Sequence, residues 1–208
     1  MNVEKTARTK RKPHAELRKT ALSAAELILV EEGLGAVTAR RVANETGCSV
    51  GTLYNIFGHL DGLIGEVNLS TFRQMAEEAS RTIRDLPESA GREERLAALA
   101  RMYLNFARTH RNRWTAVFEH RPQGPADQRI QNAEQLLFAR IISAAGIDPT
   151  GANQAEADSL RMLLAAIHGV VTFAINRTIP PADAERYVTL IVQAGLRGYR
   201  EMVDEGLL

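Results

Sequence analysis

Apolar residues along most of the chain recur every three or four positions, which is the spacing of one buried face of an α-helix. The pattern is plain between residues 14 and 32, where the apolar positions are Leu17, Ala21, Ala24, Ala25, Ile28 and Leu29. Gly33 and Gly35 follow and end this predicted helix. Two short helices, over residues 38–46 and 50–57, come next, and a longer helix runs from Asp61 to about residue 84.

Beyond Pro87 the same spacing predicts longer helices, with Pro or Gly in several of the gaps between them. The predicted ranges are 91–110, 112–119, 126–145, 154–177 and 182–203. No segment alternates apolar and polar residues at every second position, as a half-buried strand does. The sequence therefore predicts an all-α fold with about nine helices.

The segment from Thr38 to Phe57 carries the most specific local pattern in the chain. Thr38 and Ser49 stand where their hydroxyls would cap a helix, by accepting a hydrogen bond from a free backbone N–H. Gly47 stands between the two helices, where a left-handed backbone costs little without a β-carbon. Leu53 and Phe57, four residues apart, share one face of the second helix and leave the opposite face open. The segment predicts a helix-turn-helix, whose second helix enters the major groove of DNA.

Charge is distributed unevenly, although the whole chain has a net charge of only +1. Residues 1–60 hold 9 basic and 6 acidic side chains, whereas residues 61–208 hold 17 and 19. The first 19 residues hold 7 basic and 2 acidic side chains, including every lysine of the chain. A basic end on a nearly neutral body predicts a polyanionic partner for that end. A solvated, disordered tail is the alternative.

The remaining composition is typical of a soluble globular protein, with 45% hydrophobic residues as material for a core. No run of about 18 uncharged apolar residues occurs, so we expect no membrane span. The basic N-terminus is not followed by the apolar run of a secretory signal. The single cysteine, Cys48, rules out an internal disulfide, and we expect a cytoplasmic protein.

The helix-turn-helix residues and the order of the helices resemble those of TetR-family transcriptional regulators. The resemblance is carried by Thr38, Val42, Ala43, Gly47, Ser49, Gly51, Thr52, Leu53, Tyr54, Phe57 and Leu63. The segment Ile167-His168-Gly169 is similar to a Trp-His-Gly signature in the regulatory domains of some members. The resemblance implies a basic disordered leader at residues 1–13, a DNA-binding domain at 14–60, and a ligand-binding and dimerisation domain at 61–208.

The same resemblance implies a ligand-responsive, DNA-binding repressor without a cofactor, and not an enzyme. Its expected partners are a double-stranded DNA operator, a small hydrophobic or amphipathic effector and a second copy of the chain, with no membrane partner. The predicted helices 154–177 and 182–203 have apolar faces that can pair with their symmetry mates as a four-helix bundle. Burial of both faces within one chain is the alternative.

Candidate DNA-contacting residues come from the basic leader, the first helix and the helix-turn-helix. They are Lys10, Arg11, Lys12, Lys19, Thr38, Arg40, Ser49, Val50, Gly51, Thr52, Tyr54, Asn55 and His59. The resemblance places a base-reading arginine at Arg40, whose planar fork can bind guanine O6 and N7; pairing with Glu45 or solvent is the alternative. The Tyr54 hydroxyl suits phosphate oxygens, or else the ring packs on a neighbouring helix. Asn55 suits adenine N6 and N7, or else it is a polar surface residue.

One position departs from the family pattern. Members usually carry a phosphate-binding lysine three residues after the aromatic residue that ends the recognition helix, and here that position is Leu60. The resemblance then leaves phosphate contact to His59 or to the backbone N–H groups that open the next helix. Asp61 favours that helix start through the helix dipole but repels a phosphate.

Candidate ligand-binding residues are large, mostly apolar side chains from the C-terminal two thirds of the chain. They are Met102, Tyr103, Phe106, Trp114, Phe118, Phe138, Met162 and His168. As a set they predict an apolar pocket with few polar groups. Each of them, judged alone, is more typical of a core residue.

A small all-α enzyme or a metal-binding helical protein is the alternative function. The five histidines are scattered, and no metal-binding, nucleophile or phosphate-loop motif occurs. A metal site built from His110, His120 and a carboxylate is the specific form that this alternative takes.

Overall fold

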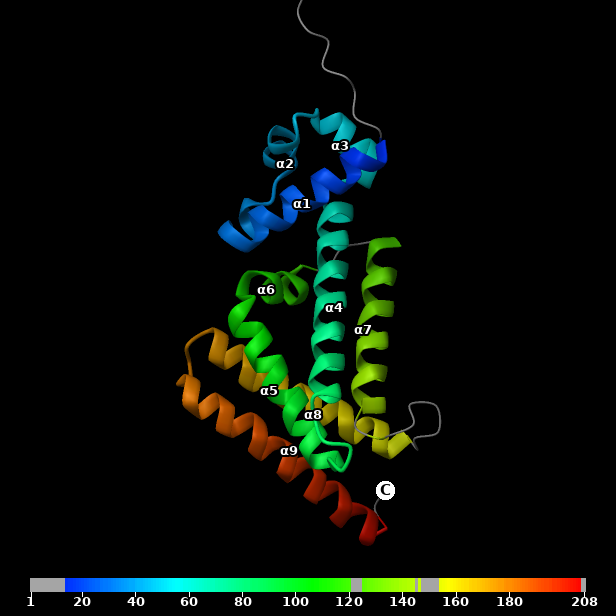
Figure 1. Ribbon diagram of the computed structural model, residues 1–208, viewed down its shortest axis with the longest axis vertical. Coiled ribbons are helices and arrows are strands. Elements are labelled where there is room, and N and C mark those ends of the chain that lie inside the picture. Colours follow the sequence, from blue (N-terminus) through cyan, green and yellow to red (C-terminus); the bar gives the residue numbers. More distant parts are fainter. Residues whose placement is uncertain (1–13, 121–124, 145, 147–153, 207–208) are drawn as a thin grey trace, which may run out of the picture.

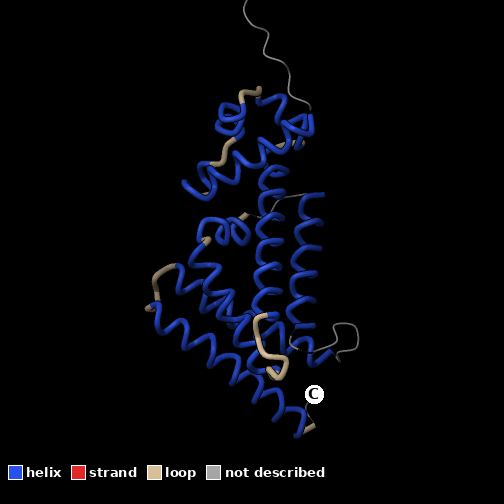
Figure 2. The backbone as a smooth tube through the Cα atoms, viewed as in Figure 1, coloured by secondary structure: helices blue, strands red, loops and turns tan. Residues whose placement is uncertain are grey.

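The computed structural model describes residues 14–120, 125–144, 146 and 154–206, and the regular elements in these ranges are all helical (Figure 2). They are α1 (His14–Glu32), the 3₁₀ helix η1 (Leu34–Ala36), α2 (Ala39–Thr46), α3 (Val50–Phe57), α4 (Leu60–Arg84), α5 (Arg92–Thr109), α6 (Arg111–Glu119), α7 (Pro125–Ala144), α8 (Gln154–Ile175) and α9 (Pro181–Asp204). The predicted all-α fold is confirmed, and the predicted α-helix ends lie within about two residues of the observed ones. The sequence does not predict η1, because three residues are too few to show a helical period.

Two apolar cores share the long helix α4. The first core lies among α1, α2, α3 and the start of α4, at the top of Figure 1, and its most buried side chains include Leu29, Val42 and Leu53. The second core lies among α5, α6, α7, α8, α9 and the middle of α4, and includes Phe106 and Val188. Each core explains the apolar spacing of the helices around it, since one face of each helix is buried there.

Helix α4 is the element that belongs to both cores. Leu63 and Val67 lie in the first core, whereas Phe72 and Met75 lie in the second. With 25 residues, α4 extends about 37 Å at 1.5 Å per residue. Helix α7 runs beside α4 in the same direction (Figure 1). A shift of α4 within the second core would therefore also move the helices of the first core, α1, α2 and α3.

The short helix α6 joins the two parts through polar contacts. The Asn112 side-chain amide donates a hydrogen bond to the Val30 carbonyl oxygen of α1 at 2.9 Å. Arg113 of α6 lies 3.5 Å from the Glu26 carboxylate of α1. Asn68 of α4, which has no exposed surface, donates to a backbone carbonyl of α6 at 3.3 Å. Buried polar groups of this kind need such partners, so these bonds fix how α6 sits against α1 and α4.

Gly62 lies where the start of α4 passes the end of α3, and its substitution tests that contact. A β-carbon at Gly62 would lie 2.1 Å from the Phe57 carbonyl oxygen, which is backbone and cannot rotate away. Gly62→Ala should therefore lower the free energy of unfolding by roughly 1–3 kcal/mol, measured by urea unfolding. Gly35→Ala is the control, because nothing lies within 4 Å of its β-carbon position. Equal unfolding midpoints for the two variants would contradict the prediction.

Candidate nucleic-acid interface

Side-chain caps and a left-handed glycine shape the helix-turn-helix. Thr38 Oγ1 accepts a hydrogen bond from the Arg41 backbone N–H at 3.2 Å, and Ser49 Oγ accepts one from the Thr52 N–H at 3.1 Å. Gly47 follows α2 with a φ of 67°, in the left-handed region that favours glycine. These three predicted roles are confirmed. Together they set the angle between α2 and α3 through local chemistry alone.

Helix α3 has one packed face and one open face. Leu53 and Ile56 are buried against α1 and α4, with 1% and 9% of their surface exposed. Gly51, Tyr54 and Asn55 are exposed on the other side, where Tyr54 keeps 42% of its surface open to solvent. The nearest atom to a β-carbon at Gly51 would be Ser49 Oγ, at 3.8 Å, so another backbone can approach closely there. An eight-residue helix with this exposed face suits insertion into a major groove.

The two arginines of α2 differ in their partners. Arg41 pairs with Glu32 at 2.9 Å and with Glu45 at 3.1 Å. Arg40 is exposed and makes no ion pair within the described ranges. The alternative in which Arg40 pairs with Glu45 is therefore not observed, because Arg41 occupies that carboxylate. Arg40 is the arginine of this helix that is available to a nucleic acid.

The remaining candidate DNA-contacting residues come from α1, the start of α4 and the leader. Lys19 is exposed on α1, and His59 is exposed at the N-cap of α4, where its side chain makes no capping hydrogen bond. Leu60 is half-buried against the first core, which accounts for an apolar residue at that position. Asp61 accepts a hydrogen bond from His120 Nε2 at 3.1 Å when that nitrogen is protonated. The candidates Lys10, Arg11 and Lys12 lie outside the described residues.

Sequence patterns do not identify Arg18, which lies on α1 and contacts the end of α3. Its Nη1 donates a hydrogen bond to the Ile56 carbonyl oxygen at 3.2 Å, and its Nη2 lies 3.1 Å from Glu66 Oε1 of α4. The two ends of the first bond are 38 residues apart in the sequence. Periodicity and motif spacing report neighbours within one element, so no local signal identifies such a contact.

Four of the candidate ligand-binding residues form one aromatic cluster. The cluster consists of Tyr103 from α5, Trp114 and Phe118 from α6, and His168 from α8. The Trp114 ring centre lies 4.8 Å from that of Phe118 and 5.3 Å from that of His168. Tyr103 Oη lies 2.8 Å from His168 Nδ1. Such ring distances are those of favourable aromatic packing.

The protonation states in this aromatic cluster follow from burial. Burial raises the pKa of the Tyr103 hydroxyl, so this group keeps its proton and can donate a hydrogen bond to His168 Nδ1 when that nitrogen is unprotonated. Burial also lowers the pKa of His168, which favours the neutral ring that this bond requires. Trp114 is 4% exposed, and its buried Nε1 makes no hydrogen bond of full geometry among the described residues, although it lies near enough to the Tyr103 hydroxyl to oppose part of the rise in that pKa. An unpaired buried donor of this kind is available to an acceptor on a ligand.

The other four ligand candidates do not join this cluster. Phe106 is fully buried in the second core, with its ring centre 4.8 Å from that of His110. Met102 is half-buried beside the same core. Phe138 lies under the Arg161 guanidinium, 5.5 Å from it, and Met162 is 71% exposed on α8. Exposure of Met162 excludes it from an interior pocket in this conformation.

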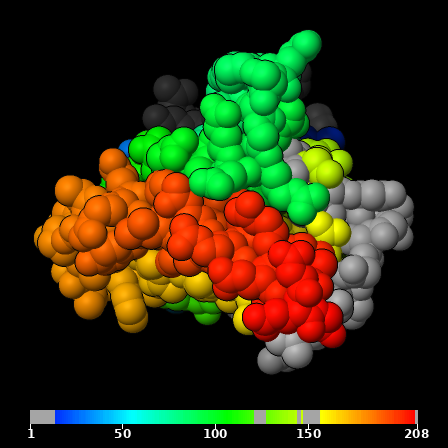
Figure 3. All heavy atoms as spheres, turned by 90° about the horizontal axis from the view of Figure 1, so that it is seen from below, coloured from blue at the N-terminus to red at the C-terminus, as the bar shows by residue number. Residues whose placement is uncertain are grey.

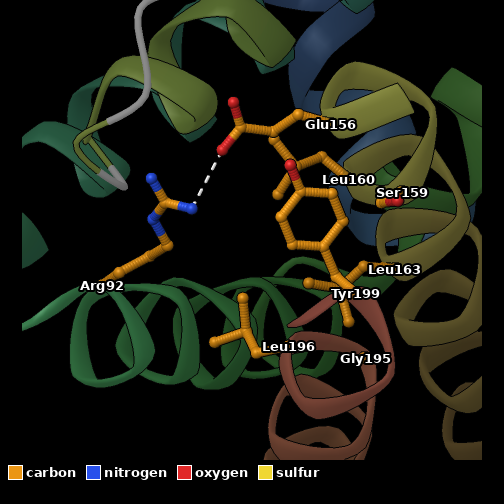
Figure 4. Close-up of a pocket in the computed structure, with 8 residues that line it drawn as sticks. All are labelled: Arg92, Glu156, Ser159, Leu160, Leu163, Gly195, Leu196 and Tyr199. Carbon is orange, nitrogen blue, oxygen red and sulfur yellow. Dashed lines mark hydrogen bonds and ion pairs between the residues drawn. The ribbon is translucent and has the colours of Figure 1, made fainter. Parts of the chain in front are cut away.

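Two hollows in the described part of the chain lie away from the aromatic cluster. The first, between α5, α8 and α9, has a volume of about 20 Å³ and is bridged by the Arg92–Glu156 ion pair at 2.9 Å (Figure 4). That volume holds about one water molecule. The second is an open cleft of about 480 Å³ at the ends of α4 and α7, lined by Glu77, Ser80, Arg81, Arg84 and Arg140. None of the candidate ligand-binding residues lines either of these two hollows.

The two histidines of the alternative metal site have other partners. His110 Nε2 lies 3.1 Å from the Gln74 side-chain amide, and His120 Nε2 lies 3.1 Å from Asp61 Oδ1. Within residues 14–120, 125–144, 146 and 154–206, no group of three or more His, Cys, Asp and Glu side chains is placed to hold a metal ion.

Comparison with protein families gives two matches. Residues 21–67 match the model of bacterial regulatory proteins of the tetR family, and residues 96–195 match that of a tetracyclin repressor-like C-terminal domain. The two matches together cover well over half of the chain, and they follow one another in the order of the two cores. No curated protein matches the sequence at a significant level.

Solved structures share the arrangement of helices at low sequence identity. A TetR transcriptional regulator from Rhodococcus sp. RHA1 is 19% identical, with a TM-score of 0.68 over 88% of this chain and 98% of its own. A TetR-family transcriptional regulator from Streptomyces coelicolor is 15% identical, with a TM-score of 0.72 over 92% and 85%. A protein of unknown function from Rhodococcus sp. RHA1 is 22% identical, with a TM-score of 0.70 over 93% and 98%. These likenesses show the fold alone.

A helix-turn-helix mounted on a separate helical body defines a DNA-binding transcriptional regulator. The chain belongs to the TetR family, as the resemblance of residues 38–57 predicts. The family model of the N-terminal residues describes bacterial regulatory proteins. The individual DNA-contacting and ligand-contacting residues remain predictions.

The lowered pKa of His168 predicts how stability depends on pH. The unfolded chain titrates near the ordinary value of about 6.5 and the folded chain titrates lower, so the unfolded state binds more protons between the two values. Stability should therefore be fully present above about pH 6.5 and should fall as the pH is lowered through that window. His168→Gln keeps an acceptor without titrating, so its thermal midpoint should fall less than that of the wild type between about pH 7.5 and 5.5. Parallel pH profiles for the two proteins would contradict this.

Proposed function

We propose that the chain is a dimeric repressor, and that a small apolar molecule releases it from its operator. The main support is α3, an eight-residue helix with its buried face on α1 and α4 and with Gly51, Tyr54 and Asn55 exposed together. In this proposal α3 enters the major groove and reads base edges. Val50 and Thr52 would contact the bases and the backbone that line the groove. Thr38 and Ser49, at the starts of α2 and α3, would face phosphates.

Cations around α3 supply the sequence-independent part of the proposed binding. Arg40 is exposed and has no ion pair among the described residues, so it addresses a base or phosphate without breaking a contact. Arg41 would first have to leave Glu32 and Glu45. Lys19, His59 and the leader residues Lys10, Arg11 and Lys12 are the further proposed backbone contacts. Family members usually carry a phosphate-binding lysine at the position of Leu60. In the proposed interface, side chains of α1, α2 and the leader take over that contact.

Exposed apolar side chains on α8 and α9 support a homodimer. Met162 and Phe173 on α8 are 71% and 54% exposed, and Leu190 and Val203 on α9 are 47% and 44% exposed. Figure 3, which views the molecule from below, shows α9, in orange to red, lying across that face. The stretch Glu156–Ile175 has a mean hydropathy of 1.4 and is long enough to cross a membrane by length and composition alone, yet only 28% of it is buried in the single chain. Pairing with a second copy would cover this surface.

The aromatic cluster of Tyr103, Trp114, Phe118 and His168 is the proposed effector site. Its rings favour a flat apolar molecule, and the unpaired Trp114 N–H favours one with a hydrogen-bond acceptor. The rings pack on one another, so a ligand would enter by moving them apart. A ligand that binds the open arrangement more tightly would shift the protein towards it. The two recognition helices of a dimer would then no longer match the spacing of the half-sites.

Tyr54 tests the proposed DNA interface. Tyr54→Ala should weaken operator binding by roughly 1–3 kcal/mol, because it removes an exposed ring and hydroxyl from the face of α3 that enters the groove. Fluorescence anisotropy on a DNA fragment selected by the wild type from genomic DNA measures the loss. Tyr54→Phe separates the hydroxyl from the ring, since a phosphate contact predicts a loss for this variant as well. Wild-type affinity for Tyr54→Ala would refute the proposed docking.

Phe173 tests the proposed dimer. Phe173→Glu places a charge on the α8 face, and we expect it to convert the dimer into a monomer in sedimentation at micromolar concentration. Leu136→Glu is the matched control, because Leu136 on α7 is 56% exposed but lies outside α8 and α9. If both variants remain dimers, or if both dissociate, the interface lies elsewhere.

A further inference from the structure

Arg18 holds the C-terminal end of the recognition helix. Besides its 3.2 Å hydrogen bond to the Ile56 carbonyl oxygen, its guanidinium carbon lies 4.8 Å from the centre of the Phe57 ring. Ile56 and Phe57 are the last two residues of α3. Carbonyl groups at that end of a helix lack partners within the helix and carry partial negative charge. One cation from α1 therefore contacts the position where α3 ends and favours it.

Glu66 connects this cation to a second arginine on a different helix. Arg18 Nη2 lies 3.1 Å from Glu66 Oε1, and the same oxygen accepts a hydrogen bond from Arg129 Nη1 of α7. The Glu66 side chain is only 13% exposed, whereas the Arg18 and Arg129 side chains are 42% and 50% exposed, so water and salt screen the two pairs in part. One carboxylate oxygen thus lies between two guanidinium groups, one from α1 and one from α7.

We infer that Glu66 is a positioning residue through which the placement of α7 controls the recognition helix. Arg129 precedes Ile130, which is fully buried in the second core, so Arg129 moves with α7 as a whole. A shift of α7 along α4 changes the distance from Arg129 to Glu66, and with it the hold of Glu66 on Arg18. This inference rests on the proposed docking of α3 to DNA, and it adds a route of control that does not pass through α6.

This arrangement joins three helices, whereas other arginine–carboxylate pairs of the described residues join two helices, as Arg108–Glu185 does, or lie within one. Arg161–Asp158 and Arg186–Asp183 each join residues three apart on one helix, so they connect no two elements. Exposed pairs of that kind contribute little to stability. The shared Glu66 oxygen instead joins α1, α4 and α7.

Glu66→Gln separates the positional effect from simple electrostatics, because the two have opposite signs. Removing a carboxylate makes the DNA-binding end more positive, which by itself strengthens binding to phosphates. Loss of the connection instead frees Arg18 and the end of α3, so we expect operator affinity to fall at least about threefold. Anisotropy on the selected DNA fragment at two salt concentrations measures this. Affinity equal to or greater than that of the wild type would overturn the inference.

A double-mutant cycle tests whether the two arginines act through the same carboxylate. Arg129→Gln should also lower affinity, and adding it to Glu66→Gln should cause no further loss, because both variants break one connection. Arg108→Gln is the control, since Arg108 pairs with Glu185 between α5 and α9 in the body and should leave affinity unchanged. Losses that add up in the double variant would overturn the inference.

Hydrogen exchange in the free protein separates failure of this inference from failure of the proposed function. Glu66→Gln and Arg129→Gln should each speed exchange of the backbone amides of α3, while those of α5 keep wild-type rates. Glu66→Gln could lower the thermal midpoint, which would itself speed exchange. The Arg129 side chain is 50% exposed, so we expect Arg129→Gln to leave stability unchanged, and this variant then provides the readout. A wild type that selects no DNA refutes the proposed docking and leaves this readout in place. Unchanged exchange in α3 overturns the inference whatever the DNA result.

Discussion

The placement of the recognition helix depends on the close contact between the end of α3 and the start of α4. No room exists for even a methyl group between Gly62 and the Phe57 carbonyl oxygen. Helix α4 then continues without a break for 25 residues and enters the second core. Long helices bend only gently, so a tilt imposed on α4 in the body becomes a displacement of α3. The remaining contacts adjust this geometry but do not create it.

Apolar contacts stabilise each core, and polar contacts connect one core to the other. Each core is closed by side chains such as Leu53 or Phe106 that have almost no exposed surface, and their burial favours one packed arrangement. The contacts between the cores include polar ones, such as the Asn112 bond to α1 and the Glu66 pairs with two arginines. Polar contacts can exchange partners with water at little net cost. The two cores can therefore stay intact while their relative orientation changes, which is what a regulated DNA-binding protein requires.

Local chemistry explains why the sequence predicts the helices and the helix-turn-helix so closely. Thr38, Gly47 and Ser49 act on residues within three or four positions of themselves, so their roles can be read from spacing. Arg18 and Glu66 act across tens of residues, and nothing in the sequence around them distinguishes them from the other charged residues of the chain. The same limit applies to Met162, a predicted pocket residue that is 71% exposed on α8, whereas Leu160, Leu163, Ile167 and Val171 of the same helix are buried. Amphipathic spacing identifies a buried face but not whether this chain or a second copy buries it.

Under the proposed function, the buried indole of Trp114 limits how much binding free energy an effector can gain from one hydrogen bond. Leaving its N–H unpaired costs about 1–3 kcal/mol, and a ligand acceptor would recover that amount. Reversing a 99:1 preference between two conformations requires about 5.5 kcal/mol of differential binding, which one hydrogen bond does not supply. The remainder must come from apolar contact with the rings of Phe118 and Tyr103, so the effector must be largely apolar as well as able to accept a hydrogen bond. Trp114 follows Asn112 and Arg113 by one or two residues on the same short helix, and those two residues contact α1. A ligand large enough to shift Trp114 therefore acts on the DNA-binding end of the molecule directly.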